Sequence, residues 1–388
     1  MARMRSAYAR TFFAGVEVTA TLEDQATSIT YTDPDSGESD TIAIAMTDTS
    51  GRWLGSWMPS KGDQIRAAFG VRNWTSDGDN RELNAGLFIL DSYGGSCSPG
   101  GDTVNIGGVS QPADQGFTSE KRSKTWKNVT VAEIEAEIAS RYGLAAVYDA
   151  KKIKVKAKTQ SKQTDSEFLA AVAKDYGLAL KVYSEKLVLF DRNECMTRAP
   201  VAAIDKSQML TCSPQVELTG TYTGARVAYT DPTTEKTVSY TYGREGRMLK
   251  VNKTCDSPAE AQLMARSALF AANHGDMTIS FSLPGNPSIC ASQVLLLTGI
   301  GQFSGLYYID KITHTLSGSG YTCQYECSNV NNDNSDGESA SGGGSGSGSG
   351  GSSTRQSRAE GALAGSGHTY NALGSGGGAN RNMTPQVN

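Results

Sequence analysis

The stretch Gly86-Leu87-Phe88-Ile89-Leu90-Asp91 returns later in the chain as Gly305-Leu306-Tyr307-Tyr308-Ile309-Asp310. In both copies a threonine follows the aspartate after twelve residues, Thr103 in the first and Thr322 in the second. Apolar runs of this kind, bounded by turn-forming residues, are typical of buried β-strands. The repeated spacing indicates that the chain contains two related β segments.

A second pair of stretches precedes the first pair in the same order: Tyr31-Thr32-Asp33-Pro34 and Tyr229-Thr230-Asp231-Pro232. One such similarity is weak, because turns of this composition recur in many β proteins. Two similarities in the same order favour two copies of one β-barrel-like domain. The alternative is two unrelated sandwiches with similar hairpins. A duplicated chain that forms a closed trimer would present six quasi-equivalent units.

Alternating apolar and polar residues surround both copies. Between residues 11 and 110 the alternation predicts antiparallel strands, with a turn at Asp33-Pro34-Asp35-Ser36-Gly37; the apolar positions are Val16/Val18, Ile29/Tyr31 and Ile42/Ile44/Met46. The pattern resumes from Val216 to Cys327, through Val216/Leu218, Ala225/Val227/Tyr229 and Val238/Tyr240/Tyr242. One helix interrupts it, with Ser257 as N-cap, Pro258 at the first helical position and Glu260 completing a capping box.

The region between the two β segments has a different character. Thr130-Val131-Ala132-Glu133 is a capping box, and its helix ends near Tyr142-Gly143-Leu144. The same phrase returns 34 residues later, from Thr164-Asp165-Ser166-Glu167 to Tyr176-Gly177-Leu178. Strands are expected at 179–183 and 187–190. Residues 126–190 are therefore predicted to form an α+β insert of two helix–strand units.

The chain of 388 residues is long enough for several domains. We expect a first β-barrel-like domain at 8–122, an α+β middle domain at 123–192, a second β-barrel-like domain with one helix at 193–330, and a tail at 331–388. The tail is rich in Gly and Ser and has few apolar residues, so it is expected to be disordered. Arg355, Arg358 and Arg381 in the tail are interpreted as solubilising charges first and partner anchors second.

Composition excludes several classes of protein. With 36 basic and 40 acidic residues, the net charge of −4 creates no overall positive field for nucleic acid or an anionic membrane. No stretch is long and apolar enough to span a bilayer, and the first residues do not resemble a signal peptide. The seven cysteines are few and odd in number, which predicts reduced thiols and use in a cytoplasm.

The sequence offers little chemistry. His274 is expected to contact the end of a helix, His314 to occupy one face of a strand, and His368 to lie in the tail. Cys323 and Cys327 are expected on one strand face, about 13 Å apart, which is too far for one metal. The glycines 346, 348 and 351 match a nucleotide-binding pattern only by linker composition. We therefore predict no catalytic, cofactor or metal site, although a hidden carboxylate pair stays open.

Two local features have competing interpretations. As a strand, residues 151–158 would place Lys152, Lys154, Lys156 and Lys158 on one face and Ile153, Val155 and Ala157 on the other. This face is interpreted as a solvated edge or, alternatively, as a docking patch for an acidic partner or cell-wall polymer. Trp53 and Trp57 predict a packed corner, with a binding platform as the alternative and an oligomer seam compatible with both.

Several of these motifs together resemble a known family. They are Ile29-Thr30-Tyr31-Thr32-Asp33, the corner from Trp53 to Asp63, Leu283-Pro284-Gly285-Asn286-Pro287, and residues 308–322. Their order and spacing are similar to the phage late control protein D family, the baseplate or tail hub proteins of contractile phages and related injection particles. The resemblance covers residues 10–328 and excludes the tail.

The resemblance implies a non-enzymatic homotrimer. Two barrel-like domains per chain would form a pseudo-sixfold ring that continues the tail tube, while the opposite face receives a trimeric spike. Expected partners are the tail tube protein, the spike and other baseplate proteins, with DNA or cargo passing without specific binding; no cofactor or membrane anchor is implied. The expected location is the virion baseplate after assembly in the bacterial cytoplasm. The alternatives are cell-wall binding through a LysM-like insert and, third, a wall hydrolase.

Overall fold

A computed structural model describes residues 4–330, except 61, 113, 218–220, 231–236, 254 and 256. Of the described residues, 50% lie in strands and 20% in helices, which confirms the prediction of a mainly β protein. The predicted tail at 331–388 lies outside the described residues, and with it His368, the three tail arginines and the glycine pattern.

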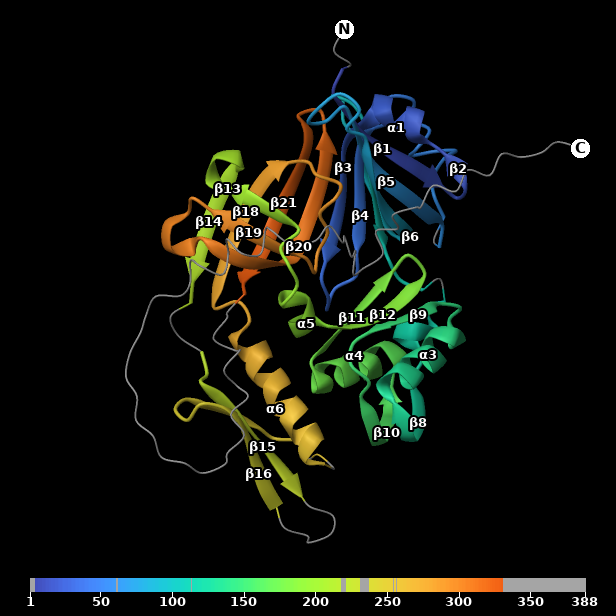
Figure 1. The fold of residues 1–388 in the computed structure, drawn as a ribbon. Helices are drawn as coiled ribbons and strands as arrows, with labels where there is room; N and C mark the ends of the chain where they lie inside the picture. The colour runs from blue at the N-terminus through green and yellow to red at the C-terminus, as the bar shows by residue number, and fades with distance from the viewer. Residues whose placement is uncertain are drawn as a thin grey trace, which may run out of the picture.

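A thirteen-stranded, almost wholly antiparallel sheet dominates the molecule (Figure 1). Its first half contains β1 (Ser6–Phe13), β2 (Val16–Glu17), β3 (Ala26–Pro34), β4 (Thr41–Thr47), β5 (Gln64–Arg72), β6 (Arg81–Ser96) and β7 (Thr103–Val109). Its second half contains β13 (Ala202–Asp205), β14 (Thr211–Val216), β18 (Met277–Pro284), β19 (Val294–Thr298), β20 (Gly305–Ser317) and β21 (Gly320–Asn329). The two halves join where β20 pairs with β3.

The period-two pattern explains how this sheet packs. Along β4, Ile42, Ile44 and Met46 are buried, whereas Ala43 is exposed. Side chains of both halves meet in one hydrophobic core, which includes Tyr31 from the first half and Tyr325 from the second. Alternation therefore predicted both the strands and their buried faces correctly.

One predicted strand position is wrong. Val16 belongs to the two-residue strand β2, but Val18 is the N-cap of a short helix, α1 (Thr19–Gln25). The buried side chain of Leu22 anchors this helix on the sheet core, and Thr19 bonds back to the Thr11 amide of β1. Tertiary packing thus overrides a local alternation of only two residues.

The two halves share one strand order. The first half reads β3-β4-β7-β6-β5-β1, and the second half reads β14-β18-β21-β20-β19-β13. The first five strands of each series pair antiparallel with their neighbours, in matching sequence order. The sixth strand differs, because β1 pairs antiparallel with β5 whereas β13 pairs parallel with β19.

The repeated hexapeptides occupy equivalent places in the two halves. Gly86–Asp91 lies in β6 and Gly305–Asp310 lies in β20. The ladder of β6 with β7 is irregular at Asp91, and that of β20 with β21 is irregular at Asp310. Each strand therefore carries a bulge at the repeated aspartate, where a strand bends and its twist increases.

The other predicted similarity does not connect equivalent strands. Tyr31–Pro34 lies in β3 of the large sheet, whereas Tyr229 and Thr230 end β15 (Gly224–Thr230) of a separate three-stranded sheet. Asp231 and Pro232 lie outside the described residues. The strand equivalent to β3 is β14, so this tetrapeptide similarity is a coincidence of turn composition.

The α+β insert follows β7 and forms the lower right of Figure 1. Its elements are α2 (Gly116–Ser119), β8 (Arg122–Thr130), α3 (Val131–Arg141), β9 (Ala145–Asp149), β10 (Lys154–Gln163), α4 (Asp165–Tyr176), β11 (Leu178–Tyr183), β12 (Lys186–Asp191) and α5 (Arg192–Met196). Both predicted capping boxes are present, at Thr130 with Glu133 and at Thr164 with Glu167. The two predicted helix–strand units are therefore confirmed as secondary structure.

The lysine run begins later as a strand than predicted. Lys152 and Ile153 precede β10, which begins at Lys154 and pairs with β8. Val155 is buried as expected, but Ala157 is exposed. The pair β8–β10 forms a separate two-stranded sheet, which offers only a narrow buried face.

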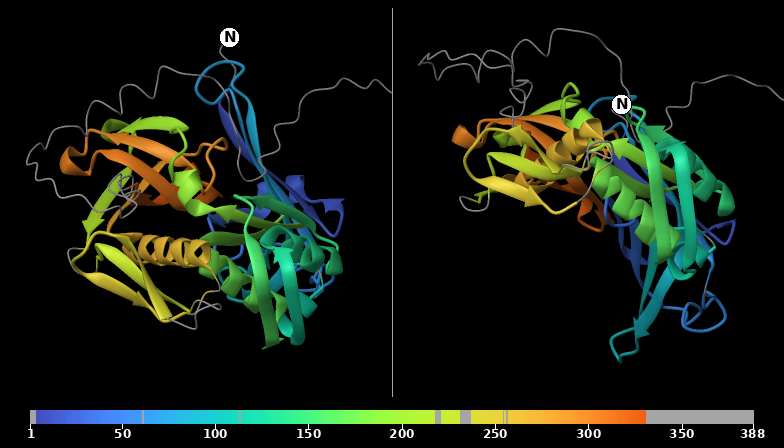
Figure 2. Two further views of the ribbon diagram at one scale, coloured as in Figure 1. Left: turned by 60° about the horizontal axis from the view of Figure 1, so that its bottom comes forward. Right: turned by 90° about the horizontal axis from the view of Figure 1, so that it is seen from below.

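The remaining elements form a small layer beside the insert. The strands are β15, β16 (Thr237–Gly243) and β17 (Met248–Val251), and the helix is α6 (Pro258–Asn273). Figure 2 shows α6 lying along these strands, and their apolar residues share a core with α3 and α4. Ser257 caps α6 as predicted, by accepting from the Glu260 amide, while the Glu260 carboxylate accepts from Tyr176 Oη at 2.8 Å.

Candidate functional site at the junction of the two sheet halves

The two sheet halves meet along the second part of β20. Residues 311–317 of β20 pair antiparallel with residues 28–34 of β3, so that Lys311 opposes Pro34 and Ser317 opposes Ser28. The Asp35 amide continues this ladder by donating to the Asp310 carbonyl at 2.8 Å. The turn that follows β3 is thereby fixed at the bulge of β20.

A buried lysine of the insert fastens this turn. Lys181 of β11 forms ion pairs with Asp33 and with Asp40, the latter at 2.9 Å, and donates to the Pro34 carbonyl at 2.8 Å. Tyr31 Oη donates to Asp40 at 2.8 Å, and the Ala291 amide donates to Asp33 at 2.9 Å. The lysine cluster, defined as Lys181 with Asp33 and Asp40, therefore joins the first sheet half, the insert and the second sheet half.

Electrostatics in the lysine cluster follow from its burial. Burial, partly offset by the Lys181 ammonium, raises the pKa of Asp40 to about 7. Burial lowers the pKa of Lys181, but the two carboxylates outweigh that effect and raise the pKa overall. Lys181 therefore stays protonated. Its buried positive charge needs the carboxylates as partners, and these ion pairs hold the insert against the two sheet halves.

A second buried contact lies on the other side of the same turn. Arg192 of α5 forms an ion pair with Asp35 at 2.7 Å, and Tyr308 Oη donates to Asp35 at 3.2 Å. Burial, partly offset by Arg192, raises the pKa of Asp35. His274, at the C-cap of α6, lies nearby, with its Nε2 2.6 Å from Asp310 of β20. The turn after β3 thus contacts the insert through Arg192 and the second sheet half through Tyr308 and Asp310. Asp310 in turn contacts His274 at the end of α6.

Sequence reasoning identified the turn but not its partner. The sequence predicts Asp33 and Asp35 as turn formers, whereas it predicts Lys181 only as part of the strand 179–183. One signal was available: Lys181 shares its strand face with Ala179 and Tyr183, which are both buried. A lysine on an apolar strand face indicates a buried carboxylate partner.

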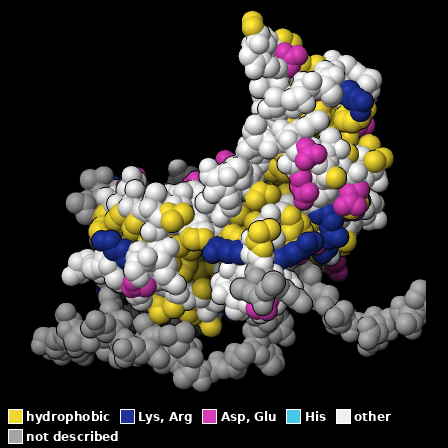
Figure 3. All heavy atoms as spheres, turned by 90° about the horizontal axis from the view of Figure 1, so that it is seen from above, with side chains coloured by type: hydrophobic (Ala, Val, Ile, Leu, Met, Phe, Trp, Pro, Cys, Tyr) yellow, Lys and Arg dark blue, Asp and Glu magenta, His cyan; other side chains and the backbone are white. Residues whose placement is uncertain are grey.

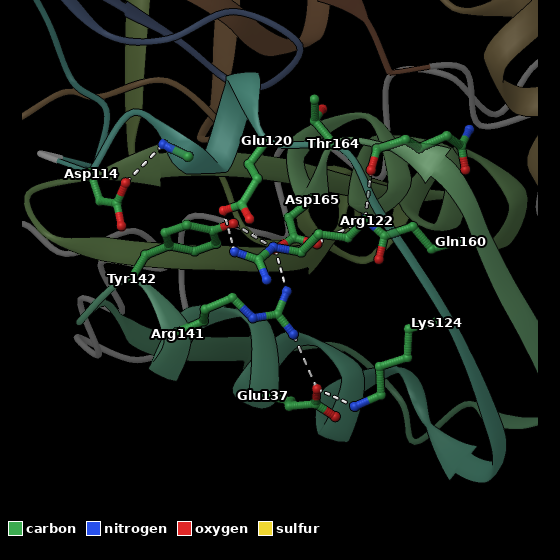
Figure 4. A network of polar contacts seen from close by, with 12 residues as sticks. Asp114, Glu120, Arg122, Lys124, Glu137, Arg141, Tyr142, Gln160, Thr164 and Asp165 are labelled. Carbon is green, nitrogen blue, oxygen red and sulfur yellow. Dashed lines mark hydrogen bonds and ion pairs between the residues drawn. The ribbon is translucent and has the colours of Figure 1, made fainter.

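The insert contains its own polar network, centred on Asp165 at the start of α4 (Figure 4). The fully buried carboxylate forms an ion pair with Arg141, accepts from Tyr142 Oη at 2.6 Å and accepts from Gln160 Nε2 at 2.8 Å. Arg122 lies 3.7 Å away. Burial raises the pKa of Asp165, but these donors outweigh it and the pKa is lowered overall. A satisfied carboxylate of this kind organises structure.

The predicted single residues have structural surroundings. His314 lies in β20 as predicted, fully buried, with Nδ1 2.7 Å from Tyr321 Oη and 3.1 Å from Cys323 Sγ. Burial lowers its pKa to about 4, so the imidazole is neutral. Cys323 and Cys327 lie in β21 and are both buried in the core, which confirms their shared face. All seven cysteines are free thiols.

The tryptophan corner is half buried. Trp53 is buried and donates to Gln25 Oε1 at 2.9 Å, whereas Trp57 is exposed and meets the edge of Trp53 at a centroid distance of 5.6 Å. The predicted packed corner is therefore confirmed for Trp53 only.

In the insert, Lys158 of the lysine run forms an ion pair with Asp175 at 3.0 Å.

Neither a metal site nor a membrane helix is found in the described part of the chain. No three His, Cys, Asp or Glu side chains are grouped as metal ligands there. No helix among those residues combines the length and apolarity needed to cross a bilayer.

A small cavity borders the lysine cluster, lined by Tyr31, Leu83, Tyr183 and Cys290. Figure 3 shows hydrophobic side chains beside a band of Lys and Arg on one face, with Asp and Glu on the same face.

A curated relative matches part of the chain. A probable baseplate hub protein of Escherichia phage 186 is 29% identical over 184 residues, which are 47% of this chain and 44% of the relative. The chain is thus matched to less than half of that relative's length. No protein-family model matches the chain.

Solved structures match most of the chain. A tail protein from Neisseria meningitidis aligns with a TM-score of 0.64 and 12% identity, over 83% of this chain and 96% of that chain. A tail protein of prophage MuSo2 from Shewanella oneidensis aligns with a TM-score of 0.65 and 11% identity, over 84% of this chain and 99% of that chain. An Escherichia coli protein of the type VI secretion system aligns with a TM-score of 0.51 and 10% identity, over 84% of this chain and 78% of that chain.

These findings confirm the resemblance expected from the sequence. The structural matches have low sequence identity and therefore establish the fold, while the sequence match points to the hub proteins among proteins of that fold. The chain has the fold of phage tail proteins and is similar in sequence to a phage baseplate hub protein.

Proposed function

We propose that the chain is a structural hub protein of a phage tail baseplate or a related injection particle. In this proposal it acts as a homotrimeric adaptor between the sixfold tail tube and the threefold spike of a contractile tail. Its other partners are baseplate proteins, its location is the virion baseplate, and cargo or DNA passes through its lumen without specific binding. The proposal includes no enzymatic activity.

The observation that carries this proposal is the repeated strand order in one sheet. Three copies of a chain with two similar half-sheets would present six similar surfaces around one axis. Such a ring can contact a sixfold partner on one side and a threefold partner on the other. The fixed junction between the halves suits this role, because a symmetry adaptor must hold its two repeated units at a constant angle.

The finer organisation belongs to the same proposal. The first and second barrel-like domains would span 8–122 and 193–330, the middle domain 123–192 would resemble a LysM module, and 331–388 would be a separate segment. The shared core of the insert with α6 and β15–β17 supports a further grouping of these elements around the middle domain.

A deletion of the gene in the producing strain tests the function. Without the chain, electron micrographs should show no complete tails, because tube and spike lack their adaptor. Plasmid-borne full-length protein should restore the tails. Normal particles in the deletion strain would contradict the proposal.

We further propose that the segment 331–388 contacts a neighbouring baseplate or spike protein. Removal of residues 336–388 should then lower the yield of particles that carry a spike, while the purified protein should still contain three chains. Size-exclusion chromatography with light scattering and particle counts measure the two effects. An unchanged yield would refute this role of the segment.

A further inference from the structure

Several edges of the large sheet lack a second partner strand in the described part of the chain, and two of them correspond to the two sides of the internal junction. The strand β14 ends the sheet and pairs with β18 alone. The second part of β6, from Ser92 to Ser96, pairs with β7 alone, because the ladder with β5 reaches no further than Ile89. Unpaired backbone groups along such edges are templates for another strand.

The junction inside the chain shows how such edges can be joined. The strand β3 adds to β20 just beyond the Asp310 bulge. In the repeated strand order β14 corresponds to β3, and β6 corresponds to β20. The same junction between β14 and β6 cannot form within one molecule, because Figure 1 places these strands on opposite sides of the structure. It can form between two molecules.

We propose that β14 of one copy pairs antiparallel with residues 92–98 of the next copy, just beyond the Asp91 bulge. This inference rests on the proposed function, since it specifies the contact by which the hub trimer closes. The contact is head-to-tail, and repetition of a head-to-tail contact generates a ring when the rotation closes. The contact would continue the established junction of β3 with β20 from one molecule into the next.

The repeat also sets the register of this contact. At the internal junction Ile29 opposes Leu316, which lies six residues beyond the Asp310 bulge. Cys97 lies six residues beyond the Asp91 bulge and therefore corresponds to Leu316. Cys212 corresponds to Ile29, because the ladders through β18 and β4 place the two at the same level of their half-sheets. Cys212 of one copy should therefore oppose Cys97 of the next.

Backbone directions on β14 agree with this contact. The Glu217 amide donates to the Asp276 carbonyl at 2.8 Å, so the odd-numbered residues of β14 face β18. The backbones of Cys212, Pro214 and Val216 consequently face the open edge. Pro214 has no amide hydrogen and removes one bond from the proposed ladder, while the amides of Cys212 and Val216 remain available as donors.

Exposed apolar side chains border both edges. Leu210 is 60% exposed and Val216 is 41% exposed on and beside β14. At the other edge Trp57 is 41% exposed and Met58 is 62% exposed. These two follow the corner of Trp53, whose carbonyl accepts from Tyr93 of β6. Four of the seven large apolar side chains exposed in the described part of the chain thus lie at these two edges.

Oxidative crosslinking of the full-length protein tests the contact. Opposite residues in antiparallel strands have Cα atoms about 4.5–5.5 Å apart, within the range of a disulfide. Copper(II)–phenanthroline should link Cys97 to Cys212 between copies: the two thiols release two protons, and two copper(II) ions each accept one electron. We expect dimers and trimers on non-reducing gels and the linked peptide in mass spectra. Cys97→Ser and Cys212→Ser should each abolish these bands.

A one-residue shift provides the matched control. In the double variant Ser96→Cys with Cys97→Ser, the new thiol lies on the opposite face of the strand, away from Cys212. It should not crosslink, although position 96 is exposed, as position 97 is. Crosslinking of this variant as strong as that of the natural protein would overturn the proposed register.

The oligomeric state separates the two proposals. A protein that runs as a trimer without oxidant but yields no Cys97–Cys212 link would refute this strand pairing and leave the hub trimer standing. Links between two Cys97 residues would also refute it, because they indicate a symmetric contact. A protein that stays monomeric and unlinked at every concentration would count against both proposals.

Discussion

The lysine cluster concentrates the molecule's connections in one buried ammonium group. Lys181 holds Asp33 and Asp40 in a place that water does not reach, so each charge depends on its partners. Removal of one member of a buried ion pair is more costly than the pair's own net contribution, because the remaining charge stays buried and uncompensated. The junction of the three parts therefore depends on this residue.

Lys181→Met should lower the free energy of unfolding by about 3–5 kcal/mol, because two carboxylates lose their counter-charge. Urea denaturation measures this loss. Lys186→Met, on the neighbouring strand β12, is the matched control and should cost less than about 1 kcal/mol. Addition of Asp40→Asn to Lys181→Met should recover part of the loss. Equal effects of the two lysine variants would contradict the role of the cluster.

Glu135 of α3 makes stability depend on pH. Its carboxyl is fully buried, and burial raises its pKa to about 8. The folded state therefore holds the proton more tightly than the unfolded chain, whose pKa is about 4.3. This favourable contribution is complete below that pKa and is lost as the pH rises through about 8.

Glu135→Gln should therefore become more stable relative to the natural protein as the pH rises from 5 to 9. The change in that difference should reach a few kcal/mol, since one pKa unit corresponds to about 1.4 kcal/mol. Urea denaturation at several pH values measures it. Glu38→Gln, at an exposed position after β3, is the matched surface variant for comparison. A constant difference for Glu135→Gln would contradict the buried, neutral carboxyl.

At the scale of elements, two glycines allow the cost of backbone strain to be measured separately from the cost of a steric clash. Gly143 follows α3 and Gly177 ends α4, both with left-handed backbones, at φ +66° and +71°. A Cβ on Gly143 would meet no atom within 4 Å, whereas one on Gly177 would lie 2.7 Å from Ser267 Oγ of α6. The second helix of the insert therefore packs against α6 more closely than a side chain allows.

Gly177→Ala should be more destabilising than Gly143→Ala. Both variants strain the left-handed backbone, at a cost of about 1 kcal/mol. Only Gly177→Ala also forces α4 away from α6, which should add about 1–3 kcal/mol. Thermal and urea unfolding measure the difference, and Ser267→Gly in the same chain should reduce it. Equal costs for the two glycine variants would show that α6 does not pack there.

The sequence predicted most elements because they are locally determined. Capping boxes at Thr130 and Thr164 specify helix starts through bonds within four residues, and alternation in β4 specifies a buried face. The placement of β15 in a separate sheet could not be predicted, because its alternation matches that of the large sheet. Lys181 was missed because its partners Asp33 and Asp40 lie 148 and 141 residues earlier in the sequence, so no local pattern connects them.

At the scale of the whole molecule, the repeated strand order connects the fold to the proposed function. The two halves match in five strands and in the bulge at each repeated aspartate, although they share little sequence beyond these positions. One junction between unlike halves is made within the chain by β20 and β3. A closed ring needs the same junction between chains. The central claim is therefore that three chains form a trimer.

Sedimentation analysis combined with negative-stain imaging of the purified full-length protein tests the trimer most directly. Three chains of 41.0 kDa predict a particle of about 123 kDa, and class averages should show a ring with a central opening. A single species of 41.0 kDa at all concentrations, or a compact particle without an opening, would contradict the account.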